Sequence, residues 1–466
     1  MNLKRWHWVG GLALTGLTAC TVGPDYHAPH TDIGQGWSQP ASTAVPAAQS
    51  WWQSLHDAEL NRLVGLALQH NPDLQASRAR IVQARAARDA AMGLLLPQAG
   101  IAASVNALRQ SENGPLPLRQ IPFIPRDETI RDVEFDASWD TDLFGANRRT
   151  IEAARAQHQA AIASAQDVRM SLVAELVRNY LMLRGEQREW QARQQVVSLL
   201  QDNVDTVKRR VTARDVPQSA LDQAVMQCDA AAAQLPAMRA SLRALALSIG
   251  ILTGRPPESG LYLLDSPGVF PRLAGIPVGE RADVLRRRPD VRVAERQLAA
   301  ATAEIGVAKA QWFPQLVISA GAGFQSIEPG NWLTMPSQTG TIMPLVSWQI
   351  FDGGRIEAQV HAAQARERSA AQAYVSVVLA ALDDAERALS DYRHALDTLQ
   401  REQDALDAAQ RADAHAQAAF AAGEIDRQDR LTSQLALTDA RIAMLVARTQ
   451  AASSWVALNK ALGLPV

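Results

Sequence analysis

Cysteine is almost missing from this chain, since only Cys20 and Cys228 occur in 466 residues. Two isolated cysteines can form neither a disulfide framework nor a cysteine-based metal site. Aromatic residues are also few, at 5%, although hydrophobic residues make up 47% and alanine supplies much of that share. This composition favours long helices that approach one another closely over an aromatic-rich sandwich or a sugar-binding cleft.

The chain also lacks an excess of charge and the motifs of catalysis. Its formal net charge is −2, so no basic field exists to hold nucleic acid. It contains no Gly-rich loop ending in Lys-Ser/Thr, no His-Glu-x-x-His, no Cys-x-x-Cys and no Gly-x-Ser-x-Gly. We therefore expect neither an enzyme nor a protein that holds a metal or another cofactor.

The first twenty residues predict a secretory signal and a lipid anchor. A basic start and a short apolar run, too short to span a membrane as a mature helix, end in Leu-Thr-Ala before Cys20. This ending resembles the bacterial lipobox, in which the cysteine is diacylated and becomes the mature N-terminus. A plain signal peptide cut near Ala19 is the alternative. Thr21 rather than Asp after the cysteine resembles lipoproteins that are exported to the outer membrane.

The chain contains an internal repeat. The motif NPDL at 71–74 recurs as RPDV at 288–291, and Ser-Trp at 138–139 recurs at 347–348. The offset between the two copies decreases from 217 residues at the first motif to 209 at the second. The first copy therefore holds eight extra residues between these motifs, and they fit the proline-rich stretch 114–125. Because the repeated motifs occur in the same order in both copies, they indicate two pseudo-symmetric halves.

The repeat predicts the organisation of the chain. We expect a signal peptide (1–19) and a lipidated extended segment (20–50) before the first repeat (51–254). The first repeat contains a strand pair at about 98–142 and a long helical hairpin at about 146–250. A linker (255–278) leads to the second repeat (279–466), which contains a strand pair at about 315–351 and a long helical hairpin at about 355–462.

The strand-like segments alternate polar and apolar residues. Residues 132–140 do so without a fault, and 316–325 follow the same period. About ten residues is the span of a membrane β-strand, although an ordinary antiparallel sheet with one wet face has the same pattern. In a membrane, Val133 and Phe135 would meet lipid. The residues on the other, lumen-facing side would be Asp132, Glu134, Asp136 and Asp140.

Apolar residues after each strand pair repeat every seven positions, as at Leu176 and Leu183 and at Leu389 and Leu396. A strict seven-residue period of apolar residues predicts paired helices with a left-handed supercoil. About 65 residues of helix would extend roughly 100 Å. Helix-breaking residues, proline at 217 and glycine at 423, predict that the chain turns back near 215–217 and 422–424.

Four membrane-length strands are too few for a barrel with a lumen, and an open sheet edge is not tolerated in hydrocarbon. Three copies would supply twelve strands in a closed cyclic assembly. The predicted fold is therefore an α+β membrane protein, with a homotrimeric barrel of four strands per chain that continues into a long α-helical coiled-coil tunnel.

Several motifs resemble the outer membrane factors of tripartite efflux pumps, the TolC, OprM and NodT-like family. They are the start at Cys20-Thr21-Val22-Gly23-Pro24, the NPDL motif at 71–74, and the RPDV motif at 288–291 with Phe313-Pro314 after it. The resemblance covers nearly the whole chain. It implies a lipid-anchored trimer in the outer membrane with a periplasmic domain, which serves as a passive exit duct for drugs or other small toxic compounds. The implied partners are a periplasmic adaptor and an inner-membrane transporter.

The resemblance also implies a gate at the periplasmic turns, where acidic side chains of three chains crowd the axis. The hinge glycine of the family matches Gly423, and its aspartates six and nine residues later match Asp429 and Thr432, so one carboxylate ring can replace two. Pro217 marks the other hinge. Asp426 and Asp222 are further gate candidates, and Arg427 or Arg430 could pair with Asp222. Solvated charges at helix ends are the alternative for all three aspartates.

Two other functions stay open from the sequence. One is an outer-membrane component of a type I-like protein secretion system, which shares the same architecture. The other is a coiled-coil structural lipoprotein, which needs the anchor and the heptads but not the strands.

Overall fold

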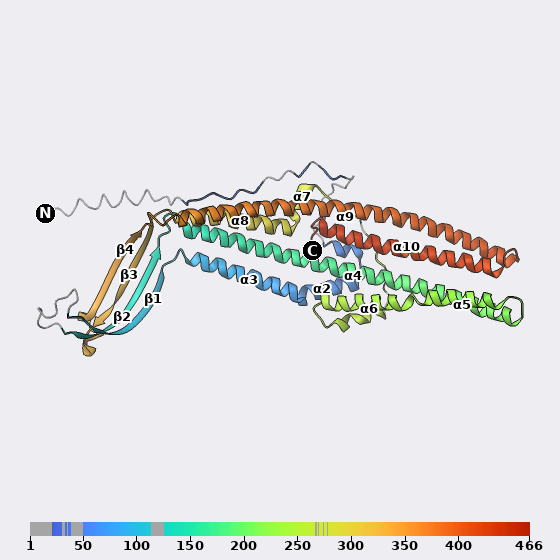
Figure 1. The fold of residues 1–466 in the computed structure, drawn as a ribbon, viewed down its shortest axis with the longest axis horizontal. Coiled ribbons are helices and arrows are strands. Elements are labelled where there is room, and N and C mark those ends of the chain that lie inside the picture. The colour runs from blue at the N-terminus through green and yellow to red at the C-terminus, as the bar shows by residue number, and fades with distance from the viewer. Residues whose placement is uncertain are drawn as a thin grey trace. The chain divides into compact units, whose positions relative to one another are not determined.

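The computed structural model describes residues 21–29, 33–34, 36–38, 50–112, 125–265, 268, 270–273, 275–276 and 278–466. The elements within them, in which η denotes a 3-10 helix, follow in chain order (Figure 1). They are η1 (Trp51–Leu55), α2 (Ala58–His70), α3 (Pro72–Gly93), β1 (Gln98–Arg109), β2 (Asp127–Asp140), α4 (Ala146–Thr212), α5 (Gln218–Ala232), α6 (Leu235–Leu252), η2 (Pro257–Leu264), α7 (Arg281–Arg287), α8 (Pro289–Ala310), β3 (Gln315–Ser326), η3 (Pro329–Asn331), η4 (Met335–Ser337), β4 (Gln338–Ser347), α9 (Arg355–Ala422) and α10 (Arg427–Ala461).

The order of these elements confirms the repeat. Each half has a 22-residue helix that begins at proline (α3 or α8), then two strands, then a very long helix (α4 or α9). Proline suits the first turn of a helix because its missing N–H has no helical partner there. In the first copy Asn71 caps this turn, because its Oδ1 accepts from the backbone N–H groups of Asp73 and Leu74 at 3.0 and 3.1 Å.

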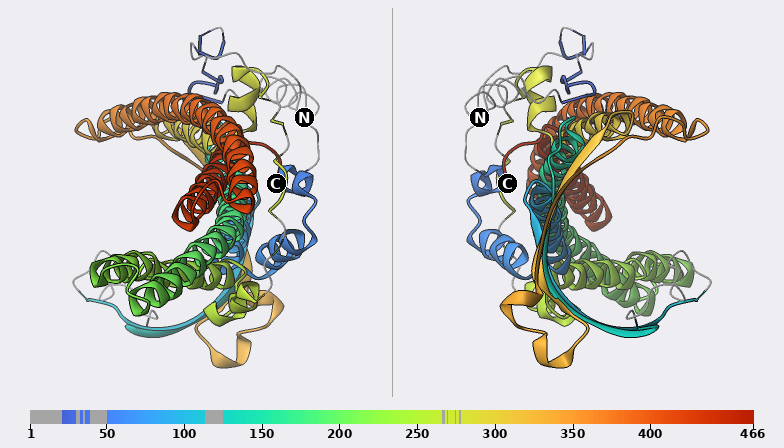
Figure 2. Two further views of the ribbon diagram at one scale, coloured as in Figure 1. Left: turned by 90° about the vertical axis from the view of Figure 1, so that its right-hand side faces the viewer. Right: turned by 90° about the vertical axis from the view of Figure 1, so that its left-hand side faces the viewer.

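The strands form one antiparallel sheet in the order β1-β2-β3-β4, which confirms four strands in the chain. The register places Phe135 of β2 opposite Ile101 of β1 and Ala322 of β3. The strands twist and curve together (Figure 2), as right-handed strand twist requires. β1 and β4 are the edges of this sheet, so each has a row of backbone groups that no strand of the described chain pairs.

The two long helices have 67 residues (α4) and 68 residues (α9), as the heptads predict. Each begins after an aspartate whose carboxylate accepts backbone N–H bonds. Asp142 accepts from Asn147 at 2.8 Å, and Asp352 accepts from Ile356 at 2.7 Å. Such caps satisfy N–H groups that the first helical turn leaves free and place negative charge at the positive end of the helix dipole.

The helices that follow the two turns differ between the halves. The second half returns through one 35-residue helix, α10, whereas the first half returns through α5 and α6 with a break at Ala233 and Gln234. Pro236 lies in the first turn of α6, and it has no N–H to continue a helix from α5. The part of the first hairpin after its turn therefore consists of two helices.

The chain divides into two compact units, and each unit contains parts of both repeats. One unit comprises 1–29, 81–161 and 294–374, and the other comprises 30–80, 162–293 and 375–466. The sheet belongs to the first unit. Its helices pack through alanines, which allow two backbones to approach closely; they are Ala153, Ala156, Ala299, Ala300 and Ala303.

The second unit contains the main hydrophobic core. Trp455 of α10 is fully buried there and packs edge-on against Trp51, with ring centroids 5.3 Å apart. Leu176 and Leu183, which the heptads predict at the seam, are also fully buried. This core therefore joins the N-terminal 3-10 helix to the middle of α4 and the end of α10.

Candidate functional site

One face of the sheet is apolar and exposed. Residues that are direct partners in the register project to the same side, so Ile101, Phe135 and Ile342 share a face, with exposed fractions of 78%, 50% and 81%. No described part of the chain covers them. The apolar members of this face are Ala99, Ile101, Ala103, Val105, Val133, Phe135, Ala137, Trp139, Ile318, Ala320, Ala322, Phe324, Ile342, Pro344 and Val346.

The opposite face carries the acidic residues of β2, together with the exposed apolar side chains of Met343 and Leu345 on β4. Asp132, Glu134, Asp136 and Asp140 alternate with the apolar residues of β2 and therefore lie together on this side. Gln325 on β3 donates to Asp132 through its amide at 3.1 Å. A glycine, Gly321, lies beside these carboxylates, and a Cβ at this position would stand only 2.0 Å from Oε1 of Glu134. Glycine therefore makes room for the acidic side chains on this face.

The two long hairpins reverse at turns of the same design. Gly423 has φ +75°, and its N–H donates to the carbonyl of Phe420 while that of Glu424 donates to Ala419. In the first half Arg214 has φ +60°, with matching bonds from Arg214 to Val211 and from Asp215 to Arg210. A left-handed residue that ends a helix with these bonds is a Schellman cap.

Arg214 is the left-handed residue that the sequence analysis missed. Proline and glycine are the usual breakers, and they drew attention to Pro217, which is in fact the residue before α5. Only the equivalence of Arg214 to Gly423 in the repeat could have indicated it. An arginine in the left-handed region costs about 1 kcal/mol relative to glycine.

The structure brings two of the acidic gate candidates together. The carboxylate of Asp426 caps α10 by accepting from the N–H of Asp429 at 2.8 Å, and Asp429 is exposed in the first helical turn. Asp222 lies on α5, in the other hairpin, where it accepts from the amide of Gln218 at 3.2 Å. The carboxylate of Asp429 has no hydrogen bond or ion pair within the described part of the chain, so its charge is available to a neighbour or to an ion.

Arg430 has a different partner from the one that we expected. It forms an ion pair with Asp413 of α9 rather than with Asp222, and both side chains are only 14% exposed. Nη2 of Arg430 donates to Oδ2 of Asp413 at 3.3 Å, and the hydroxyl of Ser433 donates to Oδ1 of Asp413 at 3.2 Å. The pairing with Asp222 is therefore wrong for Arg430, because residues on facing sides of one helical hairpin lie closer than residues of different hairpins.

The remaining expectations concern cysteine and metal chemistry. Cys20 lies outside the described residues, so its predicted acylation is not described by the structure. Cys228 is a buried free thiol on α5, and burial raises its pKa. Among the described residues no group of three His, Cys, Asp or Glu side chains is arranged to hold a metal ion.

A family model described as outer membrane efflux protein matches residues 63–255 and 281–464, which is most of the chain. The two matched stretches follow the internal repeat. Among curated relatives, nodulation protein T of Rhizobium leguminosarum bv. viciae is 29% identical over 96% of this chain and 91% of its own length. Outer membrane protein OprJ of Pseudomonas aeruginosa is 29% identical over 85% of this chain and 81% of its own length.

Solved structures have the same fold. The outer-membrane channel OprN superposes with a TM-score of 0.84 at 30% identity over 95% of this chain and 99% of that chain. The CmeC outer membrane channel of Campylobacter jejuni gives a TM-score of 0.85 over 95% of both chains, and at 22% identity this likeness concerns the fold alone.

These findings confirm the resemblance seen in the sequence, the outer-membrane location and the role of exit duct for efflux. They favour the duct over the coiled-coil scaffold, which needs no strands. The family consists of channels rather than enzymes. On the match of its family model, its relatives and its fold, the chain belongs to the outer membrane efflux protein family.

Proposed function

We propose that three copies of this chain close a twelve-stranded barrel and that the assembled duct passively conducts drugs or other small toxic compounds. The four-stranded sheet carries this proposal, because one face is apolar and exposed, the other carries the acidic residues of β2, and both edges are open. An open edge leaves backbone groups unsatisfied in lipid, which costs several kcal/mol per group. Pooling strands from neighbouring copies removes the edges.

Exposed apolar side chains on the α5–α6 return support the same assembly. The stretch Gln218–Leu252 is apolar enough and long enough to cross a membrane, yet only 22% of its apolar window is buried within the chain. The Met226 side chain is 62% exposed. We assign this surface to contact with a neighbouring copy, since the break at Ala233 and Gln234 does not suit a continuous membrane helix.

The periplasmic end of the duct is then closed by the helical turns. We assign the gate to Asp429, with Asp426 and Asp222 as further acidic members and with Gly423 and Pro217 at the hinges. Three copies of an exposed carboxylate near one axis repel one another, attract cations and titrate as coupled groups. Compounds would enter through this end from a periplasmic adaptor and an inner-membrane pump, which supply the energy. Lipid on Cys20 would add a second attachment to the outer membrane.

Barrel closure can be tested by disulfide cross-linking between copies. Cysteines replace Ala103 on edge strand β1 and Ile342 on edge strand β4, both on the apolar face, and neighbouring β4 positions are scanned to find the register. Closure predicts covalent dimers and trimers for one register. The control pairs Ala103→Cys with Ala320→Cys, because β3 is an interior strand and cannot reach β1 of another copy. Equal cross-linking of both pairs contradicts closure.

The transport role can be tested in a strain that lacks its own outer-membrane efflux proteins but retains an adaptor and a pump. Expression of the chain should lower susceptibility to pump substrates and speed the efflux of a fluorescent dye. Restored secretion of a protein substrate with unchanged drug susceptibility would favour the secretion alternative and contradict the proposal.

A further inference from the structure

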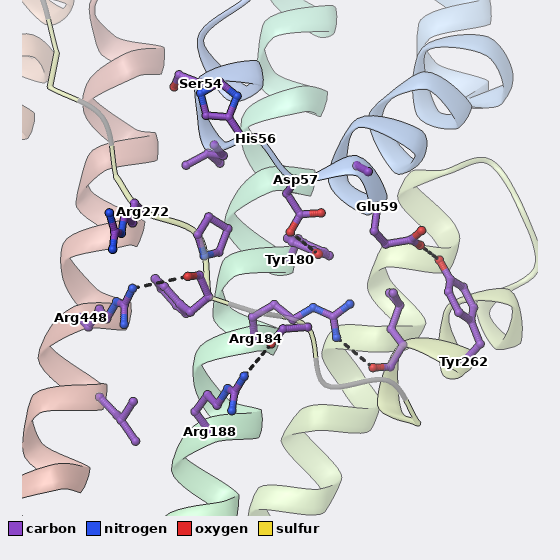
Figure 3. A pocket seen from close by; sticks show the side chains of 17 residues that line it. Ser54, His56, Asp57, Glu59, Tyr180, Arg184, Arg188, Tyr262, Arg272 and Arg448 are labelled. Carbon is purple, nitrogen blue, oxygen red and sulfur yellow. Dashed lines mark hydrogen bonds between the residues drawn. The ribbon is translucent and has the colours of Figure 1, made fainter.

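A cavity of about 1080 Å³ lies in the second compact unit (Figure 3). Its walls come from four separate parts of the sequence: residues 54–59, the middle of α4, residues 262–263 with 268 and 270–272, and α10 near Arg448. The volume is slightly above the usual range for ligand sites, about 300 to 1,000 Å³.

The acidic groups of this cavity are already engaged. The Oδ1 of Asp57 accepts from the N–H of Leu60 at 3.0 Å, and its Oδ2 accepts from the hydroxyl of Tyr180 at 2.7 Å. Glu59 forms an ion pair with Arg62 and accepts a hydrogen bond from the hydroxyl of Tyr262. Neither carboxylate forms a salt bridge with Arg188, Arg272 or Arg448 within the described residues.

Three arginines on the other wall lack a carboxylate. Arg188 of α4 donates to the carbonyl of Gly268 at 3.1 Å, and Arg448 of α10 donates to that of Phe270 at 3.4 Å and stacks on its ring at 4.7 Å. Together with the exposed Arg272, they form no salt bridge within the described residues. Asp32 is the sole acidic residue of the sequence outside those residues. We call Arg188, Arg272 and Arg448 the arginine wall.

The guanidinium groups of the arginine wall repel one another. Burial lowers the pKa of Arg448, and the positive charges of Arg272 and Arg188 lower it further. A lowered arginine pKa means that its neighbours disfavour the charged form, and an anion placed among the three groups would reverse that effect. Planar guanidinium groups bind carboxylate and phosphate oxygens in pairs, so the chemistry of this wall suits an oxyanion.

We propose that this cavity binds an organic anion, with a phosphate or carboxylate group held by Arg188, Arg272 and Arg448 and the body of the molecule lying toward Tyr262. Phosphate alone would leave most of the volume empty, and the Tyr262 side chain, 41% exposed, offers apolar surface for a larger molecule. None of the gate candidates lines this site, and the proposal concerns binding and stability rather than the passage of compounds.

Thermal unfolding of the purified full-length protein in detergent tests the site, with phenyl phosphate and phthalate as probes. A ligand that binds only the folded state raises the midpoint with concentration. We expect such a rise for one or both probes above that given by potassium chloride at equal ionic strength. A rise with phenyl phosphate alone assigns the site to phosphates, and a rise with phthalate alone assigns it to carboxylates. No rise with either probe overturns the proposal.

Substitution of the arginine wall separates binding from packing. Arg272→Gln and Arg448→Gln should each abolish most of the probe-dependent rise in the midpoint. The apparent affinity for the probe should fall tenfold or more in each variant. Arg401→Gln is the matched control, since Arg401 is an exposed arginine on α9 outside the cavity. A purely structural role would shift the midpoint equally with and without the probe. A full probe-dependent rise in both wall variants would overturn the assignment of the ligand to these arginines.

Discussion

Phe135→Arg should block insertion of the barrel, because it places a charge near the middle of the lipid-facing surface. The depth of Phe135 follows from Trp139, four residues further along the same face of β2. The Trp139 indole N–H donates to the carbonyl of Leu95 at 3.0 Å at the helical end of the strand, where an aromatic girdle is expected. Four residues rise about 13 Å, and a strand tilt of about 40° reduces this to about 10 Å of depth. Half of a 25 Å apolar band is about 12 Å, so Phe135 lies close to its middle.

The energetic cost of Phe135→Arg is large for a trimer. One arginine at the midplane of a barrel costs about 2 to 4 kcal/mol. A trimer carries three, and if their effects add, the total is about 6 to 12 kcal/mol, comparable with the stability of a whole folded domain, about 5 to 15 kcal/mol. We therefore expect few or no heat-resistant trimers in outer-membrane fractions on semi-native gels.

Asp136→Arg is the matched control, since it introduces the same side chain one residue away on the opposite face. Glycines lie opposite it on both sides, Gly100 on β1 and Gly321 on β3, so no side chain of a directly paired residue opposes it. This variant should give normal trimers and a changed ion selectivity. Phe135→Leu should also insert, which separates loss of the ring from gain of charge. Equal trimer yields for Phe135→Arg and Asp136→Arg would refute the assignment of the two faces.

The anchor, the acidic turn and the buried ion pair give three more tests. Cys20→Ser behind a cleavable signal should still reach the outer membrane and keep part of its efflux activity, because lipid chains add only a supplementary affinity; complete loss of trimers would contradict this. Asp429→Asn should lower the cation preference of single channels in planar bilayers. Asp404→Asn should not, because Asp404 is an exposed residue of α9 away from the turn. Unchanged selectivity in Asp429→Asn would place the gate elsewhere. Arg430→Met should leave the mostly buried Asp413 without its charged partner at a cost of about 2 kcal/mol, seen as faster proteolysis in the turn between α9 and α10; wild-type cleavage would show that the pair does not hold the turn.

Short-range patterns in the sequence determined most of the architecture. A period of seven is enough to identify α4 and α9, because 3.5 residues per turn keeps one face on a partner helix. A period of two is enough to place Asp132 and Phe135 on opposite faces of β2. Gly423 was found because glycine takes a left-handed conformation at little cost.

The tertiary structure decided which of these surfaces meet. A heptad identifies a face but not what covers it, so Leu183 is fully buried while Leu396, from the same kind of repeat, is 38% exposed. Arg214 takes a left-handed conformation without the residue type that signals one, because the rest of the hairpin fixes the turn. The sequence also does not reveal the cavity with the arginine wall, since its walls come from segments far apart in the chain. Local periodicity depends on neighbours in sequence, whereas ion pairs and cavities depend on long-range packing.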